Sequence, residues 1–377
     1  MRIRDFQLER YFAKYEFSVT HLLSPSDCET WSIGELLGLE AEDSPKRLKE
    51  LRLSYTESRG SSKLIDALEE LYGVEREGIV TGCPAELIFL FMNSFLESGD
   101  KVTCISPAYQ SLYELPRSIG CEVAFWRLRA EGGRWRLNLD ELESLLRASR
   151  LLILNFPHNP TGFMPDAGEF AKIVDMAARM GVTVFSDEMY RGLELDSPSL
   201  PSFAGLENAV TLGGLSKGPG LPGLRTGWLA SRRHDLISPV LGMKDYTTIC
   251  NSAPSEFLAE LALRNIETLL SRNRAILRAN AELAEKFFAR RGEVVEWIPA
   301  AGGSIAFPRL LAGDVEEMCE LSVKEKSLMI LPDKVFDVSD NRFRVGMGRG
   351  SFSSALAVFG EFLESWKTKH PPAGRGR

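Results

Sequence analysis

The run LLILNF, Leu151–Phe156, is the stretch that decides the fold of this 377-residue chain. Its first four residues are all apolar, with no polar residue at alternate positions. Such a continuous apolar run is typical of a strand that is buried on both faces. Strands of this kind occur in parallel sheets that carry helices on both sides. We therefore expect an α/β fold, with a mostly parallel sheet sandwiched between helices.

Strands and helices alternate on either side of this run, as a parallel-rich sheet requires. Apolar and β-branched runs predict strands, and helical spacing of apolar residues predicts the segments between them. The expected strands are 78–81, 101–105, 121–127, 182–186 and 208–213, and the expected helices are 62–72, 83–96, 109–119, 138–149 and 168–180.

The rest of the chain has a different character. Residues 252–291 show almost unbroken helical periodicity with a break near Arg264, and shorter strands and helices follow to about residue 365. We expect four parts: an N-terminal arm with a piece of the small domain at 1–45, a large domain at 46–265, a bridging helix with a small α+β C-terminal domain at 266–368, and a disordered tail at 369–377.

Composition excludes several classes of protein. The net charge is −7, so nucleic acid and acidic membranes are not expected partners. The six cysteines lack C-x-x-C spacing, which argues against a metal site or a disulfide framework and fits a reducing compartment. The charged amino terminus has no apolar signal core, and no apolar run reaches membrane-spanning length. We expect a cytoplasmic enzyme without a metal.

One lysine lies in a run that is too rich in glycine and proline to form a regular helix. Lys217 is part of TLGGLSKGPGLPGLRTGW, Thr211–Trp228. A G-x-G-x-x-G spacing begins at Gly218, but the prolines within it disfavour the helix that a dinucleotide site needs. A G-x-S-x-G spacing begins at Gly214, but only two histidines follow it, one of them in the polar tail, so a hydrolase is disfavoured.

Distinctive residues follow four of the predicted strands. In open α/β sheets, ligands bind at the carboxyl ends of the strands. The residues in these loops are Cys83 to Glu86, Tyr109, Asn159, and Asp187 with Tyr190. Taken alone, Asp187 also fits a helix cap, and the turn that contains Asn159 also fits a plain loop. Together with Lys217 and Arg225, however, these residues form a candidate site.

The ordered set of motifs resembles a known family. FPHNPTG at 156–162, SDEMY at 186–190, and SK followed eight residues later by Arg225 are similar to the class I/II aminotransferases, which have the pyridoxal-phosphate fold type I. The resemblance covers about residues 50–350. The segments NFPHNPTG and GLPGLRTGW look closest to the capreomycidine-synthase-like branch, whose best-known member cyclises an arginine derivative.

This resemblance implies roles around the ring of pyridoxal 5'-phosphate. Lys217 would form the Schiff base with the cofactor and then act as the base that moves the substrate α-proton. Asp187 would pair with the pyridine nitrogen, which makes the ring an electron sink. Asn159 and Tyr190 would hydrogen-bond the phenolic oxygen of the ring, and Tyr109 would stack on the ring.

The resemblance also implies residues for the cofactor phosphate. Arg225 would bind it bidentately, and further donors would come from Ser216 and from the loop Cys83, Pro84, Ala85. Tyr55 would reach the phosphate from a neighbouring subunit, which implies a homodimer.

For the substrate, Arg344 would clamp the α-carboxylate, with Gly34 and Asn159 as further contacts. The neighbouring Arg342 is expected at the surface.

Two positions depart from the family pattern. Pro84 has no N–H and Ala85 has no hydroxyl, where the family usually has a small residue followed by Ser or Thr. Gly214 lies three residues before the lysine, where a hydroxyl is common. We therefore expect weaker cofactor binding than is typical, unless Arg225, Ser216 and Tyr55 compensate.

The leading functional hypothesis is amino-group transfer between an L-amino acid and a 2-oxo acid. A second hypothesis keeps the cofactor but predicts elimination, replacement or cyclisation, and the sequence does not separate the two because the outcome depends on how the substrate is held. A third is a non-catalytic binding protein, which the intact set of polar motif residues disfavours.

Overall fold

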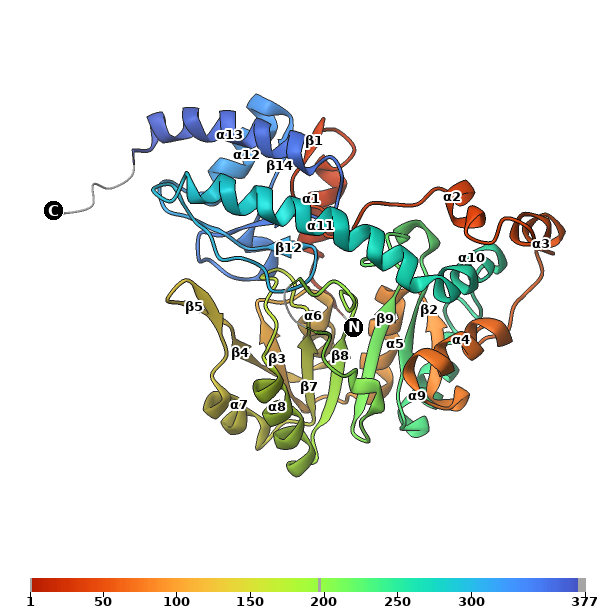
Figure 1. Cartoon of the computed structure of the whole chain (residues 1–377). Coiled ribbons are helices and arrows are strands. Elements are labelled where there is room, and N and C mark those ends of the chain that lie inside the picture. Colours follow the sequence, from red (N-terminus) through yellow and green to blue (C-terminus); the bar gives the residue numbers. More distant parts are fainter. Residues whose placement is uncertain (1, 196–197, 372–377) are drawn as a thin grey trace.

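The computed structural model describes residues 2–195 and 198–371, and a seven-stranded sheet forms its centre (Figure 1). The strand order is β2-β10-β9-β8-β7-β3-β4. Only β10 runs antiparallel to its neighbours within this sheet, so the expectation of a mostly parallel sheet is confirmed. The bounds are β2 Ile79–Gly82, β3 Lys101–Ser106, β4 Glu122–Arg127, β7 Leu151–Asn155, β8 Thr183–Asp187, β9 Ala209–Gly214 and β10 Gly227–Ala230.

Both faces of strand β7 are buried, as its apolar sequence predicts. Leu151 and Ile153 point to one face and belong to the same core cluster as residues of α5, α6 and α9. Leu152 and Leu154 point to the other face and pack with residues of α7 and α8. These helices are α5 Pro84–Phe95, α6 Ser111–Ile119, α7 Leu139–Leu146, α8 Ala167–Arg179 and α9 His234–Lys244.

A third core cluster closes the β2 edge of the sheet. Helices α4 (Ser62–Tyr72) and α10 (Ala253–Arg264) supply most of it, and they pack over Ile79, Trp228 and Ala230 of the edge strands. The short helices α2 (Ile33–Gly38) and α3 (Ser44–Glu50) lie beside α10 (Figure 1).

The long helix α11, Ile266–Ala289, crosses from α10 to the C-terminal elements (Figure 1). The predicted break is confirmed, because α10 ends at Arg264 and Asn265 separates the two helices. The elements after α11 are β11 Val295–Glu296, β12 Ile305–Ala306, β13 Arg309–Leu310, α12 Val315–Lys326, β14 Leu328–Met329, β15 Leu331–Pro332, β16 Phe343–Gly346 and α13 Phe352–Lys369. We use "C-terminal region" for residues 295–369.

The N-terminal segment is built into this C-terminal region. Helix α1 (Gln7–Tyr15) is followed by β1 (His21–Leu22), which pairs in parallel with β14. A hairpin that sequence reasoning did not predict, β5 (Arg129–Glu131) with β6 (Arg134–Arg136), extends beyond β4.

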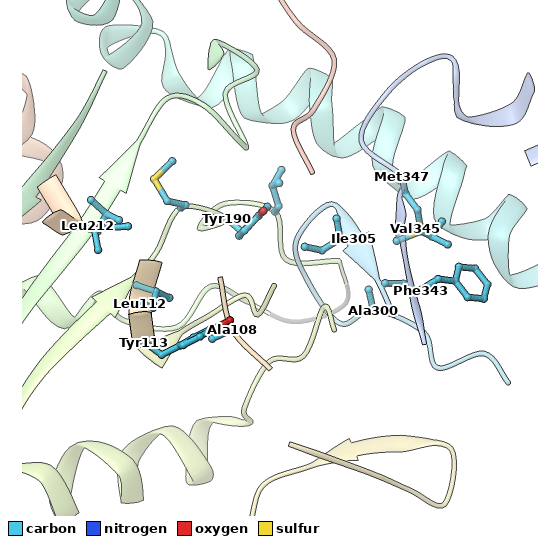
Figure 2. Close-up of a cluster of buried hydrophobic side chains, with 14 of the residues drawn as sticks. Ala108, Leu112, Tyr113, Tyr190, Leu212, Ala300, Ile305, Phe343, Val345 and Met347 are labelled. Carbon is cyan, nitrogen blue, oxygen red and sulfur yellow. The ribbon is translucent and has the colours of Figure 1, made fainter. Parts of the chain in front are cut away.

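The hydrophobic core is continuous between the central sheet and the C-terminal region. Figure 2 shows part of one cluster, in which Tyr190 and Leu212 of the sheet side accompany Ile305, Phe343 and Val345 of the C-terminal region. Loss of such a buried side chain typically costs several kcal/mol, about 2 to 5 for Leu or Ile to Ala. The two parts therefore pack against each other directly, and the site lies where they meet.

The first residues of the predicted tail, 369 and 370, are ordered. Helix α13 continues to Lys369, and His370 stacks on Trp366 with ring centroids 3.9 Å apart. Residues 372–377 of the predicted tail lie outside the described residues. Among the described helices, none combines the length and apolarity of a membrane span. The described residues also contain no group of three potential metal-ligating His, Cys, Asp or Glu side chains.

Candidate active site

The carboxyl ends of β7 and β8 bring the first site residues together. Asn155 and Asp187 lie opposite each other in the strand register. The Asn155 side chain donates to the Asp187 carbonyl oxygen at 2.9 Å and accepts from the Asn159 N–H at 2.7 Å. Asn155, which sequence reasoning did not single out, therefore fixes the loop that carries Asn159 beside Asp187.

Most of the predicted site residues line one cavity of about 580 Å³. Its wall is formed by loops at the ends of the strands, by α1 and by β16. The predicted residues in this wall are Pro84, Ala85, Tyr109, Asn159, Asp187, Tyr190, Ser216, Lys217, Arg225 and Arg344. The structure thus brings together ten of the thirteen site residues that were predicted from the sequence.

The three remaining residues lie elsewhere. Cys83 precedes α5, and its sulfur contacts Arg225 from outside the cavity wall. Tyr55 projects into solvent, with 87% of its surface exposed. Gly34 lies on the exposed helix α2 and does not line the cavity.

Asp187 is a buried carboxyl group whose charge is only partly compensated. Its Oδ1 accepts from the Met189 N–H at 3.1 Å. Burial raises the pKa of this carboxyl from 3.8 to about 6, although the Met189 N–H and the Lys217 ammonium oppose the rise. A cationic partner at this position would stabilise the ionised form, and a protonated pyridine nitrogen is such a partner.

Lys217 follows strand β9, and its side chain reaches the N-terminal segment. Its Nζ donates to Ser26 Oγ at 2.8 Å and lies 5.9 Å from the centroid of the Tyr190 ring. The amine is thus at the centre of the cavity wall, between the sheet and the N-terminal segment.

Arg225 is held in an unusual backbone conformation. Its φ is +54°, in the left-handed region, at the end of a short 3-10 turn that begins at Pro222. Its Nη1 donates to the Pro222 carbonyl at 3.0 Å, and its Nη2 donates to Cys83 Sγ at 3.1 Å. The guanidinium group is therefore fixed at the amino terminus of α5, where the helix dipole also favours an anion.

The departures from the family pattern have a steric explanation. A Cβ atom at Gly214 would lie 2.9 Å from the Met189 side chain and 3.2 Å from Pro84 Cγ. A Cβ at Gly227 would lie 2.7 Å from the same Pro84 ring atom. The proline ring thus fills space that a side chain at Gly227 would need, and a side chain at position 214 would require Met189 to move.

Two buried hydroxyl groups in the cavity wall point to a missing polar ligand. Tyr190 OH and Ser216 Oγ are buried and have no hydrogen-bond partner among the described residues. Unsatisfied buried polar groups are rare and call for an explanation. Together with Arg225, they fit a ligand that carries both a ring hydroxyl and a phosphate, as pyridoxal phosphate does.

Arg344 is fully buried on β16, and burial lowers the pKa of its guanidinium group. Its Nε donates to the Ser24 carbonyl at 3.1 Å, and its Nη1 donates to Asn159 Oδ1 at 3.2 Å. This neutral set of acceptors leaves the positive charge free for a carboxylate. The expectation that Arg342 is exposed was wrong. It is 4% exposed, because its guanidinium group donates to the Phe307 carbonyl and to Glu296 and lies over the Trp135 ring.

Several cavity residues were missed by sequence reasoning, and many of them come from α1 and the residues after it, from the segment that follows β1, and from the loop after β16. Among them are Leu8, Glu9, Phe12, Glu16, Phe17, Ser26, Asp27 and Arg349. The spacing of Glu9, Phe12 and Glu16 places them on one face of α1, a signal that the sequence contained. The sequence gave no indication, however, that this helix lies against the site.

The chain is similar to known proteins over most of its length. The family model for aminotransferase class I and II matches residues 26–352. The chain belongs to this family. Capreomycidine synthase from Streptomyces vinaceus is 30% identical over 371 residues, which is 96% of this chain and 93% of that enzyme. A probable N-succinyldiaminopimelate aminotransferase from Mycobacterium tuberculosis is 28% identical over 271 residues, covering 70% and 68% of the two chains.

Solved structures of family members superpose over almost the whole chain. A PLP-dependent aminotransferase from Streptococcus suis gives a TM-score of 0.90 at 28% identity, covering 97% of this chain and 99% of that one. The PLP-dependent cyclase OrfR also gives 0.90, at 26% identity, covering 97% and 98%. This class I/II family member has fold type I and is a pyridoxal-phosphate enzyme.

Proposed function

We propose that this enzyme transfers an amino group between an L-amino acid with a cationic side chain and a 2-oxo acid. The charge along the α1 side of the cavity is the observation that carries the substrate class. Glu9, Glu16 and Asp27 lie near one another and near Arg349 on this side, and the Arg344 guanidinium group is close to Glu9 and Asp27. Arg349 forms a bidentate pair with Asp27, with Nη2–Oδ2 at 2.8 Å and Nε–Oδ1 at 3.2 Å. Glu9 accepts from the Tyr109 hydroxyl at 3.0 Å, and neither Glu9 nor Glu16 forms an ion pair among the described residues, so both carboxylates can still accept a cationic group of the substrate.

The apolar part of the cavity wall suits a long, flexible side chain. Leu8 and the ring of Phe12 offer apolar surface to methylene groups, and aromatic faces also attract cations. Burial raises the pKa of the Glu16 carboxyl, and a cationic ligand would favour its ionised form. An ammonium or guanidinium group at the end of the side chain satisfies both requirements.

The chain's own residues supply the remaining steps. Pyridoxal phosphate, when bound, provides an aldehyde for amines and an electron-withdrawing ring. Lys217 Nζ would anchor the aldehyde and, once released, take the proton from the substrate Cα. Asp187 would hold the ring nitrogen in its charged form, and Arg344 would hold the substrate α-carboxylate. Tyr190 and the Nδ2 amide of Asn159 would donate to the ring oxygen.

A panel of amino acids without a 2-oxo acid tests this proposal. Lysine, ornithine and arginine should convert the yellow enzyme to the colourless amine form faster than leucine, alanine or glutamate. Glu16→Gln should slow the reaction of the cationic amino acids by about 10-fold, because one charge-assisted contact is lost. The rate with leucine should be unchanged. Glu207→Gln, at a side chain that is 79% exposed, is the matched control. Equal rates for lysine and glutamate would refute the proposal that the substrate has a cationic side chain.

A second candidate function is cyclisation or elimination. The full-length similarity to capreomycidine synthase and to the cyclase OrfR favours it. The same panel separates the two functions. Release of ammonia or a cyclic product without accumulation of the amine form would support this candidate and count against amino-group transfer.

A further inference from the structure

The segment Leu23–Glu29 carries a hydroxyl group to the centre of the site. It is fixed to the C-terminal region by backbone hydrogen bonds, since the Leu23 N–H donates to Met329 O at 3.1 Å and the Gly346 N–H donates to Leu23 O at 2.7 Å. Ser304 Oγ donates to the Ser26 carbonyl at 2.6 Å. The backbone of Ser26 is thus held independently of its own side chain.

The same segment contacts Lys217 twice. The Cys28 N–H donates to the Lys217 carbonyl at 3.4 Å, and Lys217 Nζ donates to Ser26 Oγ at 2.8 Å. Ser26 is only 8% exposed. It is the only hydrogen-bond partner of this amine within residues 2–195 and 198–371. The next group, the face of the Tyr190 ring, is 5.9 Å away.

A hydroxyl group suits an amine that alternates between two protonation states. It carries one donor and two acceptor sites, and it can rotate about the Cβ–Oγ bond. It accepts a hydrogen bond from an ammonium group and donates one to a neutral amine. A carbonyl oxygen can only accept, and a nearby carboxylate would favour the ammonium form. Ser26 is therefore compatible with Lys217 both before and after the amine takes up a proton.

We propose that Ser26 is a catalytic hydroxyl that holds Lys217 Nζ on the substrate side of the cavity whenever this amine is not bonded to the cofactor. The proposal rests on the proposed function, in which Lys217 removes the Cα proton. The C–H bond breaks, its proton adds to Nζ, and the electron pair remains with the substrate and cofactor. Ser26 changes from donor to acceptor by rotation and neither gains nor loses a proton.

Labelling of the cofactor-free protein tests the contact without any turnover. Lys217 reacts with an amine reagent such as trinitrobenzenesulfonate, and its peptide is quantified by mass spectrometry. In Ser26→Ala, labelling should be about 10-fold faster, as expected for loss of one hydrogen bond, and Ser26→Thr should restore slow labelling. Lys244 is the internal control for unfolding, because it is fully buried and its Nζ donates to two carbonyl oxygens at 2.6 and 2.7 Å.

Single-turnover kinetics of the loaded enzyme test the consequence. Proton removal from an α-deuterated amino acid should be about 10- to 100-fold slower in Ser26→Ala, with a larger isotope effect, because the base is no longer held in position. Cofactor affinity should stay the same. Ser322→Ala removes a fully buried hydroxyl that bonds Leu328 O in the C-terminal region, and it should change neither readout.

The outcomes separate this proposal from the proposed function. Labelling and proton removal within twofold of the wild type in Ser26→Ala would overturn the role of Ser26. Equal losses in Ser26→Ala and Ser322→Ala would also overturn it, because they would indicate general destabilisation. If no amino acid yields the amine form but the labelling difference persists, Ser26 holds the lysine and the assigned reaction is wrong.

Discussion

At the scale of single residues, Asp187 is expected to destabilise the cofactor-free protein. Burial raises its pKa to about 6 from 3.8, so between these values the folded state binds more protons than the unfolded state. The stability contribution of this residue therefore falls as the pH rises through this window. Asp187→Asn should raise the free energy of unfolding of the cofactor-free protein at pH 8 by at most about 3 kcal/mol. The gain should be small at pH 4, close to the unfolded-state pKa of 3.8, and should vanish at lower pH, where the carboxyl group is protonated in both the folded and the unfolded state.

Urea denaturation of the cofactor-free proteins at pH 4 and pH 8 measures this effect. The comparison is between variant and wild type at each pH, because burial also raises the pKa of the adjacent Glu188. Asp235→Asn is the control of opposite sign, since the Arg233 side chain lowers the pKa of that exposed carboxyl. A variant at Asp187 that is no more stable at pH 8 than the wild type would contradict the prediction. With the cofactor bound, the Asp187→Asn variant should no longer remove the α-proton from the substrate.

Single residues also show how far sequence reasoning reached. Motif residues such as Asp187 and Asn159 were placed correctly in one cavity because their loops follow neighbouring strands. Arg342 was misplaced, because the Glu296 carboxylate and the Trp135 ring that cover it come from distant parts of the chain. Ser26 was missed because its partner Lys217 is 191 positions away in the chain, a pairing that no local pattern encodes.

At the scale of elements, helix α1 depends on Gln110 for its position over the cavity. Gln110 is 3% exposed; its Oε1 accepts from the Gln7 N–H at 2.8 Å, and its Nε2 donates to the Asp5 carbonyl at 2.9 Å. Gln110→Ala removes both bonds and should free the start of α1, at a cost of about 1 to 3 kcal/mol. We expect faster amide exchange in α1 and a higher KM for cationic amino acids, because Glu9 and Glu16 move with the helix.

Hydrogen exchange resolved by peptide tests this prediction. Asn138→Ala is the control, since it removes the cap of α7, where Asn138 Oδ1 accepts from two backbone N–H groups at 3.0 Å, far from the cavity. It should speed exchange in α7 alone. Unchanged exchange in α1 of the Gln110 variant would show that the other contacts of the helix suffice.

Helices and strands with a strong apolar pattern could be predicted from the sequence. Elements that depend on pairing with distant segments could not. The break between α10 and α11 and the buried strand β7 follow from local apolar patterns. Strand β10 is only four residues long, begins with glycine, and exists because it fits between β2 and β9. The role of α1 as a wall of the site depends on where the C-terminal region places it, which is a tertiary property.

At the scale of the whole molecule, an exposed aromatic patch predicts that two copies associate. Leu53, Tyr55 and Tyr246 are 84%, 87% and 92% exposed. Their two segments are joined, because Thr56 Oγ1 donates to the Asn251 carbonyl at 3.1 Å. Large apolar side chains gathered at a surface in this way mark interaction sites. We expect a dimer in which Tyr55 of each chain reaches the cofactor phosphate of the other.

Light scattering and cofactor titration test the dimer with three variants. The wild type should have twice the 42.0 kDa mass of the chain, and Tyr246→Glu should be monomeric and bind the cofactor poorly. Tyr55→Phe should remain dimeric but bind pyridoxal phosphate about 10- to 100-fold more weakly, the value of one hydrogen bond to a charged group. Leu311→Glu, at another exposed apolar residue outside the patch, should behave as the wild type. A monomeric wild type that retains its cofactor would contradict both the dimer and the role of Tyr55, and Arg225 with Ser216 would then hold the phosphate alone.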